Sequence, residues 1–214
     1  MSRLIAAIIH VGRRRRLRAI ELDDGRTFVL SGKTVDEAGL RAGDEVEESV
    51  LTELAERDER SRAVDLSLHS LAQRPRSESE IRRKLTQKQI SERAAEGAVV
   101  RLRELGLLDD HRFAQQWVDE RLRLRPRGRR MLRKELLDKG IARGLVEEVL
   151  DRDLKEERNA IAIAEKAMER MRSLEPGVAR RRLAAMLARR GFGYEVARFA
   201  VRRAMAGEGD EPAE

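Results

Sequence analysis

The strongest constraint on the fold is an internal repeat with a period of 51 residues. When the sequence is aligned with itself at this shift, apolar residues coincide three times without gaps. The aligned triplets are Ile81, Leu132 and Leu183; Leu85, Leu136 and Leu187; Ile90, Ile141 and Phe192; Ala95, Val146 and Ala197; and Val99, Leu150 and Val201. Each copy has two apolar pairs spaced four residues apart with a break between them, which predicts two packed helices joined by a tight turn.

The residues around each break support this interpretation. Gly140 and Gly191 occupy the position after a helix where positive φ is common, whereas the first copy has Gln89 there. Ser91 can cap the helix that follows Gln89. A further helix is expected before each pair, over residues 64–73, 110–123 and 154–171. We therefore predict a mainly α protein of three tandem three-helix repeats, nine helices in all. Because so small a unit cannot bury both helix faces, neighbours should stack into an elongated, curved array.

Residues 1–50 have a different pattern, which predicts a small β-rich module. Residues 5–11 and 17–22 favour strands, Asp24-Gly25 favours a tight hairpin, and residues 27–30 supply the return strand. The run Arg13 to Arg16 lies between the first two strands. A polar loop tip is slightly favoured there over a phosphate contact, and its role stays open.

The predicted boundaries follow from these patterns. They give a β-rich module over residues 1–50, an acidic helical connector over 51–62, three-helix repeats over 63–108, 109–153 and 154–207, and an acidic tail over 208–214.

The charge of the chain favours an anionic partner. Lys and Arg number 46 against 39 Asp and Glu, which gives a net charge of +7, and arginine far outnumbers lysine. Arginine forms planar, paired hydrogen bonds to phosphate and carboxylate groups. The absence of cysteine excludes disulfides and thiolate metal sites and fits a reducing compartment. No segment is apolar and long enough to span a bilayer, so we expect a cytoplasmic protein.

Enzyme motifs are not evident. His10, His69 and His111 are far apart, and no phosphate-binding glycine loop or nucleophile elbow is present. Asp109-Asp110 could hold a cation, but capping of the following helix is favoured. We expect no catalytic residue, no metal and no cofactor.

The candidate nucleic-acid or filament site is a basic cluster over residues 121–134, which contains no acid. Its members are Arg121, Arg123, Arg125, Arg127, Arg129, Arg130, Arg133 and Lys134. Like charges repel at this density, so an anionic partner is favoured over a plain solvated face. A second set lies in the third repeat, with exposed helix faces an equally good explanation. From that set, Arg181, Arg182, Arg189 and Arg190 are included in the candidate site.

The expected mode of DNA binding is not sequence-specific. The chain has one asparagine, Asn159, and its glutamines are not gathered on the basic helices, so base-edge reading is not expected. Most of the six aromatic residues fall at helix-periodic apolar positions, which favours the core over a base-stacking platform. Phosphate and shape contacts to single- or double-stranded DNA remain.

Several linked motifs give the chain a resemblance to a known family. Residues 105–114, Leu-Gly-Leu-Leu-Asp-Asp-His-Arg-Phe-Ala, resemble the signature of the RecX family, the modulators of the bacterial RecA recombinase. Residues 74–85 resemble the first repeat of that family, and residues 128–136 with Lys139-Gly140-Ile141 resemble its second. The β-rich module, with its turn over 39–43, resembles an extension that some members carry. Gln89 and the tail after Met205 depart from the family pattern.

The resemblance implies a protein that binds the RecA–DNA filament, lowers its ATP hydrolysis and strand exchange, and binds DNA itself. A monomer is expected. The sequence leaves open whether the effect is inhibitory or stimulatory and which repeat contacts protein. The alternatives are a helical-repeat DNA-binding regulator without a recombinase partner, a protein scaffold, and a metal-dependent nuclease, for which no ligand set is evident.

Overall fold

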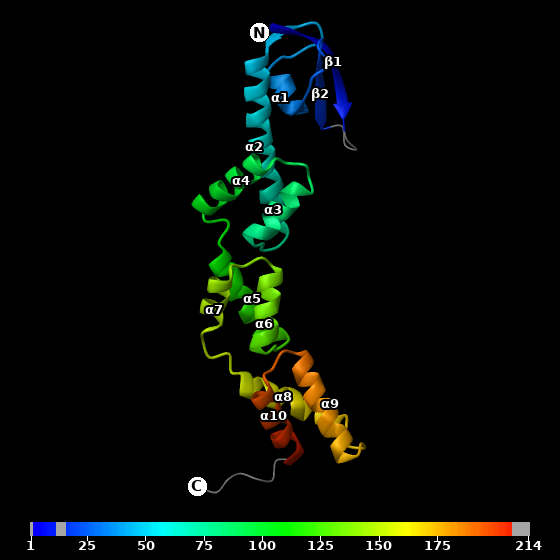
Figure 1. The fold of residues 1–214 in the computed structure, drawn as a ribbon, viewed down its shortest axis with the longest axis vertical. Coiled ribbons are helices and arrows are strands. Elements are labelled where there is room, and N and C mark those ends of the chain that lie inside the picture. The colour runs from blue at the N-terminus through cyan, green and yellow to red at the C-terminus, as the bar shows by residue number, and fades with distance from the viewer. Residues whose placement is uncertain (1, 12–15, 207–214) are drawn as a thin grey trace. The chain divides into compact units, whose positions relative to one another are not determined.

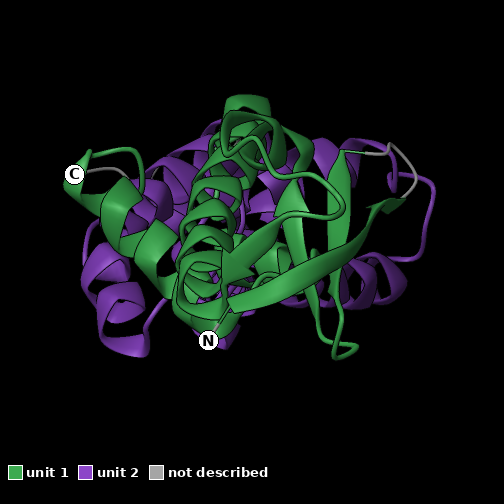
Figure 2. Cartoon of the chain, turned by 90° about the horizontal axis from the view of Figure 1, so that it is seen from above, with its two compact units in different colours: residues 1–76, 80–108 green, residues 77–79, 109–214 purple. Residues whose placement is uncertain are grey.

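The structure is a computed structural model that describes residues 2–11 and 16–206. It divides into two compact units, residues 1–76 with 80–108 and residues 77–79 with 109–214, coloured green and purple in Figure 2. Figure 1 follows the elements in chain order. Arg13, Arg14 and Arg15 and the acidic tail over 208–214 lie outside the described residues, so the predictions about them stay predictions.

The first unit begins with a small antiparallel sheet. Strands β1 (Ser2–Val11), β2 (Leu17–Leu22), β3 (Thr27–Ser31) and β4 (Glu45–Glu47) lie in the order β3-β2-β1-β4. The hairpin predicted at Asp24-Gly25 is confirmed, with Gly25 at φ +84° and its N–H donating to the Leu22 carbonyl. The short helix α1 (Gly32–Glu37) follows β3 and is capped by the Ser31 hydroxyl, which accepts from the Thr34 N–H.

Helix α2 (Glu48–Gln73) covers the sheet and continues into the first three-helix domain. The acidic helical connector predicted over 51–62 and the helix predicted over 64–73 form one continuous helix. Neither glycine nor proline interrupts residues 48–73, so no backbone break separates the two parts. Leu51 packs into the sheet core, whereas Ala63 belongs to the core of the first domain.

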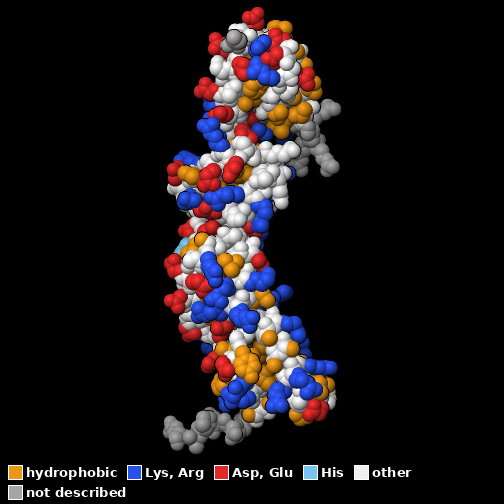
Figure 3. Space-filling model, in the orientation of Figure 1, with side chains coloured by type: hydrophobic (Ala, Val, Ile, Leu, Met, Phe, Trp, Pro, Cys, Tyr) orange, Lys and Arg blue, Asp and Glu red, His pale blue; other side chains and the backbone are white. Residues whose placement is uncertain are grey.

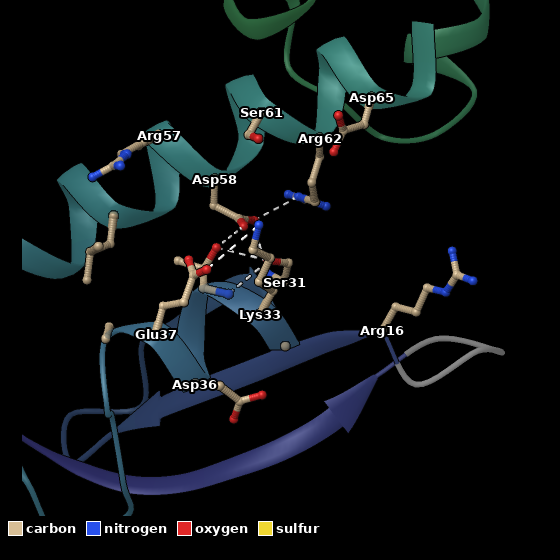
Figure 4. Close-up of a pocket in the computed structure, with 14 residues that line it drawn as sticks. Arg16, Ser31, Lys33, Asp36, Glu37, Arg57, Asp58, Ser61, Arg62 and Asp65 are labelled. Carbon is tan, nitrogen blue, oxygen red and sulfur yellow. Dashed lines mark hydrogen bonds and ion pairs between the residues drawn. The ribbon is translucent and has the colours of Figure 1, made fainter. Parts of the chain in front are cut away.

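A buried carboxylate joins α2 to the sheet module. Asp58, 4% exposed, accepts from the Ser31 N–H at 3.0 Å and from the Thr34 hydroxyl, and its Oδ2 lies 2.9 Å from the Arg62 Nε. Figure 4 shows Asp58, Ser31 and Arg62 converging between α1 and α2, and Lys33 and Arg57 line the same hollow. A buried charge is costly unless it is paired and hydrogen-bonded, so this network accounts for an acid inside the unit.

The first domain is completed by α3 (Glu78–Thr86) and α4 (Glu92–Glu104). Ile81, Leu85 and Leu102 are fully buried in its core. The predicted cap at Ser91 is confirmed, because its hydroxyl accepts from the Ala94 N–H. Gln89 adopts φ +58°, the left-handed conformation in which glycine is favoured.

The second and third domains lie in the second unit. The second consists of α5 (Asp110–Leu124), α6 (Arg129–Asp138) and α7 (Arg143–Leu150), and the third of α8 (Glu156–Glu169), α9 (Pro176–Arg189) and α10 (Tyr194–Ala206). Asp109 caps α5 by accepting from the Arg112 N–H at 2.9 Å, which confirms capping as the role of this acid. Three tandem three-helix domains and a small antiparallel sheet therefore confirm the predicted mainly α fold class.

A glycine contact joins the second and third domains. The Gly128 N–H donates to the Arg190 carbonyl at 3.0 Å, and the Arg130 N–H donates to the Gly191 carbonyl at 3.2 Å. A Cβ at Gly191 would overlap the Met131 backbone nitrogen, and Gly191 also has φ +86°. Position 191 thus requires glycine for two reasons: the Met131 backbone lies too close for a Cβ, and the positive φ is unfavourable for other residues.

Candidate nucleic-acid interface

The predicted basic cluster is divided by its intramolecular partners. Arg121, at the end of α5, lies 2.8 Å from Glu135 through its Nε, and its guanidinium stacks 4.1 Å from the centre of the Trp117 ring. The Trp117 Nε1 donates to the same Glu135 carboxylate at 2.8 Å, and Lys139 covers the ring at 4.6 Å. Arg121 therefore belongs to a packed cluster that holds α5 against α6.

Two further members of the cluster, both on α6, are paired as well. Arg133 forms two hydrogen bonds to Glu147, both 2.7 Å, which raise the pKa of Arg133 and lower that of Glu147. Lys134 donates to Asp138 at 2.7 Å, and this bond raises the pKa of Lys134. The range 121–134 contains no acid, as the sequence shows, but Glu135, Asp138 and Glu147 beyond it pair with Arg121, Lys134 and Arg133.

The remaining predicted cations have looser surroundings. Arg127 lies 4.0 Å from Glu135, and Arg129 reaches the Arg152 carbonyl at 3.3 Å while its own N–H donates to Glu156. Six predicted arginines are exposed and make no ion pair with any described residue: Arg123, Arg125, Arg130, Arg181, Arg182 and Arg189.

Arginines of the two predicted sets meet where the second and third domains adjoin. A cleft of about 670 Å³, which we call the junction cleft, is lined by Arg125, Arg127, Lys166, Arg170 and Arg190, and no acid is among its lining residues. Its apolar wall includes Ile163 and Met186. Cations held around an acid-free hollow create the local positive potential that attracts phosphate groups.

Sequence reasoning missed the contribution of α8 to this cleft. Lys166 and Arg170 are four residues apart, a spacing that places them on one helix face, so their common side could be read from the sequence. Their position opposite Arg125 could not, because it depends on how α8 packs within the second unit.

A second basic hollow, the Tyr194 hollow, lies on α9 and α10. It measures about 610 Å³ and is lined by Tyr194 and four arginines, Arg130, Arg180, Arg198 and Arg202, again without an acid. Tyr194 is 74% exposed, whereas Phe192 is 1% and Phe113 is 5% exposed. The sequence favoured the core for most of the six aromatic residues; Phe113 and Phe192 are core residues, and Tyr194 is an exception. In Figure 3, Lys and Arg side chains border apolar surface over α8, α9 and α10.

The described residues supply little for metal chemistry or membrane insertion. No group of three or more His, Asp or Glu side chains in residues 2–11 and 16–206 is arranged to hold a metal ion. His111 contacts Glu148 at 3.4 Å on the surface. Within the same ranges, every helix is too short or too polar to cross a bilayer.

Family models match all three helical domains. The first three-helix domain of RecX matches residues 63–102, the second matches 109–150 and the third matches 155–201. These matches coincide with the three groups of helices in the structure.

Curated relatives and solved structures agree with the family models. A "Regulatory protein RecX" of Streptomyces coelicolor is 36% identical over 156 residues, covering 72% of this chain and 81% of the relative. A "Regulatory protein RecX" of Clostridium botulinum is 28% identical over 189 residues, covering 86% of this chain and 88% of the relative. A RecX crystal structure superposes with a TM-score of 0.65 at 24% identity, covering 94% of this chain and 98% of that one. The crystal structure of RecX from Lactobacillus salivarius superposes with a TM-score of 0.64 at 21% identity, covering 70% of this chain and 99% of that one. At these identities the two structures support the fold.

Proposed function

The chain belongs to the RecX family of regulatory proteins, and from this premise we propose that it binds the RecA–DNA nucleoprotein filament and lowers its ATPase and strand-exchange activity. Binding can lower an activity only if the protein has higher affinity for a filament state that is less competent for it. In this proposal the protein acts by binding and catalyses no reaction of its own.

The observation that supports a DNA contact most directly is the junction cleft. Its five cations come from the loop between α5 and α6, from α8 with the residue after it, and from the residue after α9, and no acid is among the lining residues. Elsewhere on the chain, exposed arginines such as Arg82 and Arg93 are paired with carboxylates. Apart from Arg127, which lies 4.0 Å from Glu135, the cations of the junction cleft make no ion pair with a described residue. They are available to neutralise phosphates, and release of the phosphate counterions favours binding.

The proposed contact residues follow from this division. We propose that Arg123, Arg125, Arg127, Arg129, Arg130, Arg181, Arg182, Arg189 and Arg190 face DNA or an acidic surface of the filament, and that Lys166 and Arg170 join them. Arg121, Arg133 and Lys134 instead stabilise α5, α6 and α7 through their acidic partners. Because phosphates are contacted and base edges are not, single- and double-stranded DNA of any sequence should bind.

The test is the DNA-dependent ATPase of RecA, titrated with the full-length protein. The rate should fall as the protein saturates the filament, and the triple variant Arg125→Gln, Arg170→Gln, Arg190→Gln should need a higher concentration for the same effect. The matched control is Arg82→Gln, Arg93→Gln, Arg101→Gln, which removes three charges that are paired with acids. An unchanged ATPase rate at saturating binding would overturn the proposal. Tight DNA binding combined with that result would favour a DNA-binding regulator that acts without a recombinase.

A further inference from the structure

We propose that the Tyr194 hollow binds single-stranded DNA by stacking one base on the Tyr194 ring while its arginines hold the neighbouring phosphates. This inference rests on the DNA contact in the proposed function and adds which form of DNA the site selects. It concerns a hollow formed mainly by the third domain, separate from the five cations of the junction cleft.

The helix geometry places the ring and the charges along one ridge. Tyr194, Arg198 and Arg202 are spaced four residues apart on α10, so they share one face, with an axial rise of about 6 Å between successive members. On α9, Arg180 and Ala184 have the same spacing. The hollow lies between these two ridges, and Arg130 at the start of α6 completes its lining.

Packing below the hollow leaves room for a flat group. Ala184, Ala188 and Ala197 line it with methyl groups, and Phe192 and Val201, 1% and 3% exposed, lie against the domain core. Small side chains on a supported surface keep the space open next to the exposed ring. A volume of about 610 Å³ falls within the range of about 300–1,000 Å³ usual for small-ligand sites.

The charges of the hollow specify an anionic occupant. Arg130, Arg180, Arg198 and Arg202 make no ion pair with a described residue, and the nearest acid in sequence, Glu195, is not part of the lining. An exposed tyrosine alone would be unremarkable, because single exposed apolar side chains are common. A tyrosine beside four arginines that pair with no described acid combines a stacking surface with phosphate ligands.

Single-stranded DNA, one of the forms of DNA bound in the proposed function, matches both features. Its bases are free to leave the stack and lie on an aromatic ring, while its phosphates contact cations in the same groove. In a duplex the base faces are covered by neighbouring base pairs, so Tyr194 could contact only edges or backbone. An acidic peptide would match the arginines, but most of its residues have no flat ring that could stack on Tyr194.

The experiment compares three oligonucleotides of equal length with the full-length protein and no recombinase. They are oligo-dT, an abasic strand with the same phosphates, and a duplex, each followed by fluorescence anisotropy. The wild-type protein should bind oligo-dT more tightly than the abasic strand. Tyr194→Ala should weaken oligo-dT binding about 5- to 150-fold, the range for loss of one stacked base, and leave the abasic strand unchanged.

Matched variants separate stacking from folding and from charge. Tyr194→Phe keeps the ring and should retain the preference for bases. Phe199→Ala removes another partly exposed ring of α10 that does not line the hollow, and should have no effect on the preference. Arg180→Gln with Arg198→Gln should weaken oligo-dT and the abasic strand equally and reduce the salt slope by about 0.7 for each lost contact.

Three results would overturn this inference: equal affinity for oligo-dT and the abasic strand, tighter binding of the duplex, or an equal loss for both strands in Tyr194→Ala. The RecA ATPase titration remains a separate readout. A base preference without any ATPase effect would refute the proposed function alone, and an ATPase effect without a base preference would refute the Tyr194 site alone.

Discussion

The first and third helical domains share a fold and differ in how they use arginine. In the first, Arg74 lies 2.8 Å from Glu80 and Arg82 lies 2.8 Å from Glu96, and Figure 3 shows acidic and basic side chains interspersed over α4. In the third, Arg180 of α9 and Arg198 and Arg202 of α10 line the Tyr194 hollow, and no acid is among its lining residues. The apolar repeat therefore determines the helices, and the placement of carboxylates determines which copy has cations free to bind phosphates.

The same two domains differ at the turn between their last two helices. Gly191 is buried against Met131 of the preceding domain, whereas Gln89 is exposed in the same left-handed conformation. A side chain at position 191 would collide with backbone, and the side chain at position 89 extends into solvent. A turn residue can thus lose its glycine where no neighbouring domain packs on it.

The largest effect should come from Gly191→Ala. The added Cβ overlaps the Met131 backbone and also occupies a left-handed conformation, so we expect a loss of about 3 kcal/mol or more in the free energy of unfolding. Urea denaturation measures it. The matched control is Gly106→Ala, at φ +66° with no atom near its Cβ, which should lose only about 1 kcal/mol. Equal losses would show that close approach does not constrain Gly191.

The next effect concerns the charges. At about 0.1 M salt, Arg125→Gln, Arg170→Gln, Arg190→Gln should weaken single-stranded DNA binding roughly 100-fold, because each lost phosphate contact removes about 0.7 log unit. The paired set Arg82→Gln, Arg93→Gln, Arg101→Gln should change it less than about threefold, since those cations already have acidic partners. Fluorescence anisotropy measures both affinities. Comparable losses of DNA affinity in the two triple variants would contradict the contrast between cations without acidic partners and the paired cations of the first domain.

A smaller effect is expected at the first-domain turn. Gln89→Gly relieves positive φ without creating or removing a buried contact, so unfolding should require up to about 1 kcal/mol more free energy. Thermal unfolding of the full-length chain measures the change. A destabilised variant would mean that the Gln89 side chain contributes more than its exposed position indicates.

The smallest effect is the pH dependence of one first-domain ion pair. The hydrogen bond from Arg82 holds the pKa of Glu96 below its ordinary value of 4.5. A carboxyl with a lowered pKa in the folded state stabilises the fold above its unfolded pKa, and this contribution is lost as the pH falls below about 4.5 through the folded value. Glu96→Gln should therefore flatten the stability profile in that window, by less than about 0.5 kcal/mol because the pair is exposed. In an Arg82→Gln background the same substitution should change the slope less, because only the Arg103 charge then lowers the pKa of Glu96.

Much of the fold was predictable because the relevant interactions are local or periodic. The triplet of Leu85, Leu136 and Leu187 is fully buried in all three copies, and Asp24-Gly25 forms the expected hairpin. The continuity of α2 was not foreseen: the sequence placed a domain boundary after residue 62, where acidic composition gives way to mixed composition, and one helix runs through that point.

The candidate site was predictable in part, for a related reason. The Lys134–Asp138 pair follows the four-residue helical spacing and could be read directly. Arg121 with Glu135 and Arg133 with Glu147 are fourteen residues apart, on helices that meet only when the domain packs. The same holds for Arg125 and Arg170, which share a cleft only in the folded unit.

Helix α2 sets a rule for changes in chain length. Leu51 and Asp58, seven residues apart, face the sheet module, whereas Ala63 and Ser70, also seven apart, are buried in the first domain. The five residues from Asp58 to Ala63 turn the helix by about 500°, so the two buried faces differ by about 140°. Inserting one residue between them would rotate one face by about 100° and expose its buried side chains, while four residues would restore the angle to within about 40°. Relatives with length differences at this point should therefore gain or lose whole helical turns.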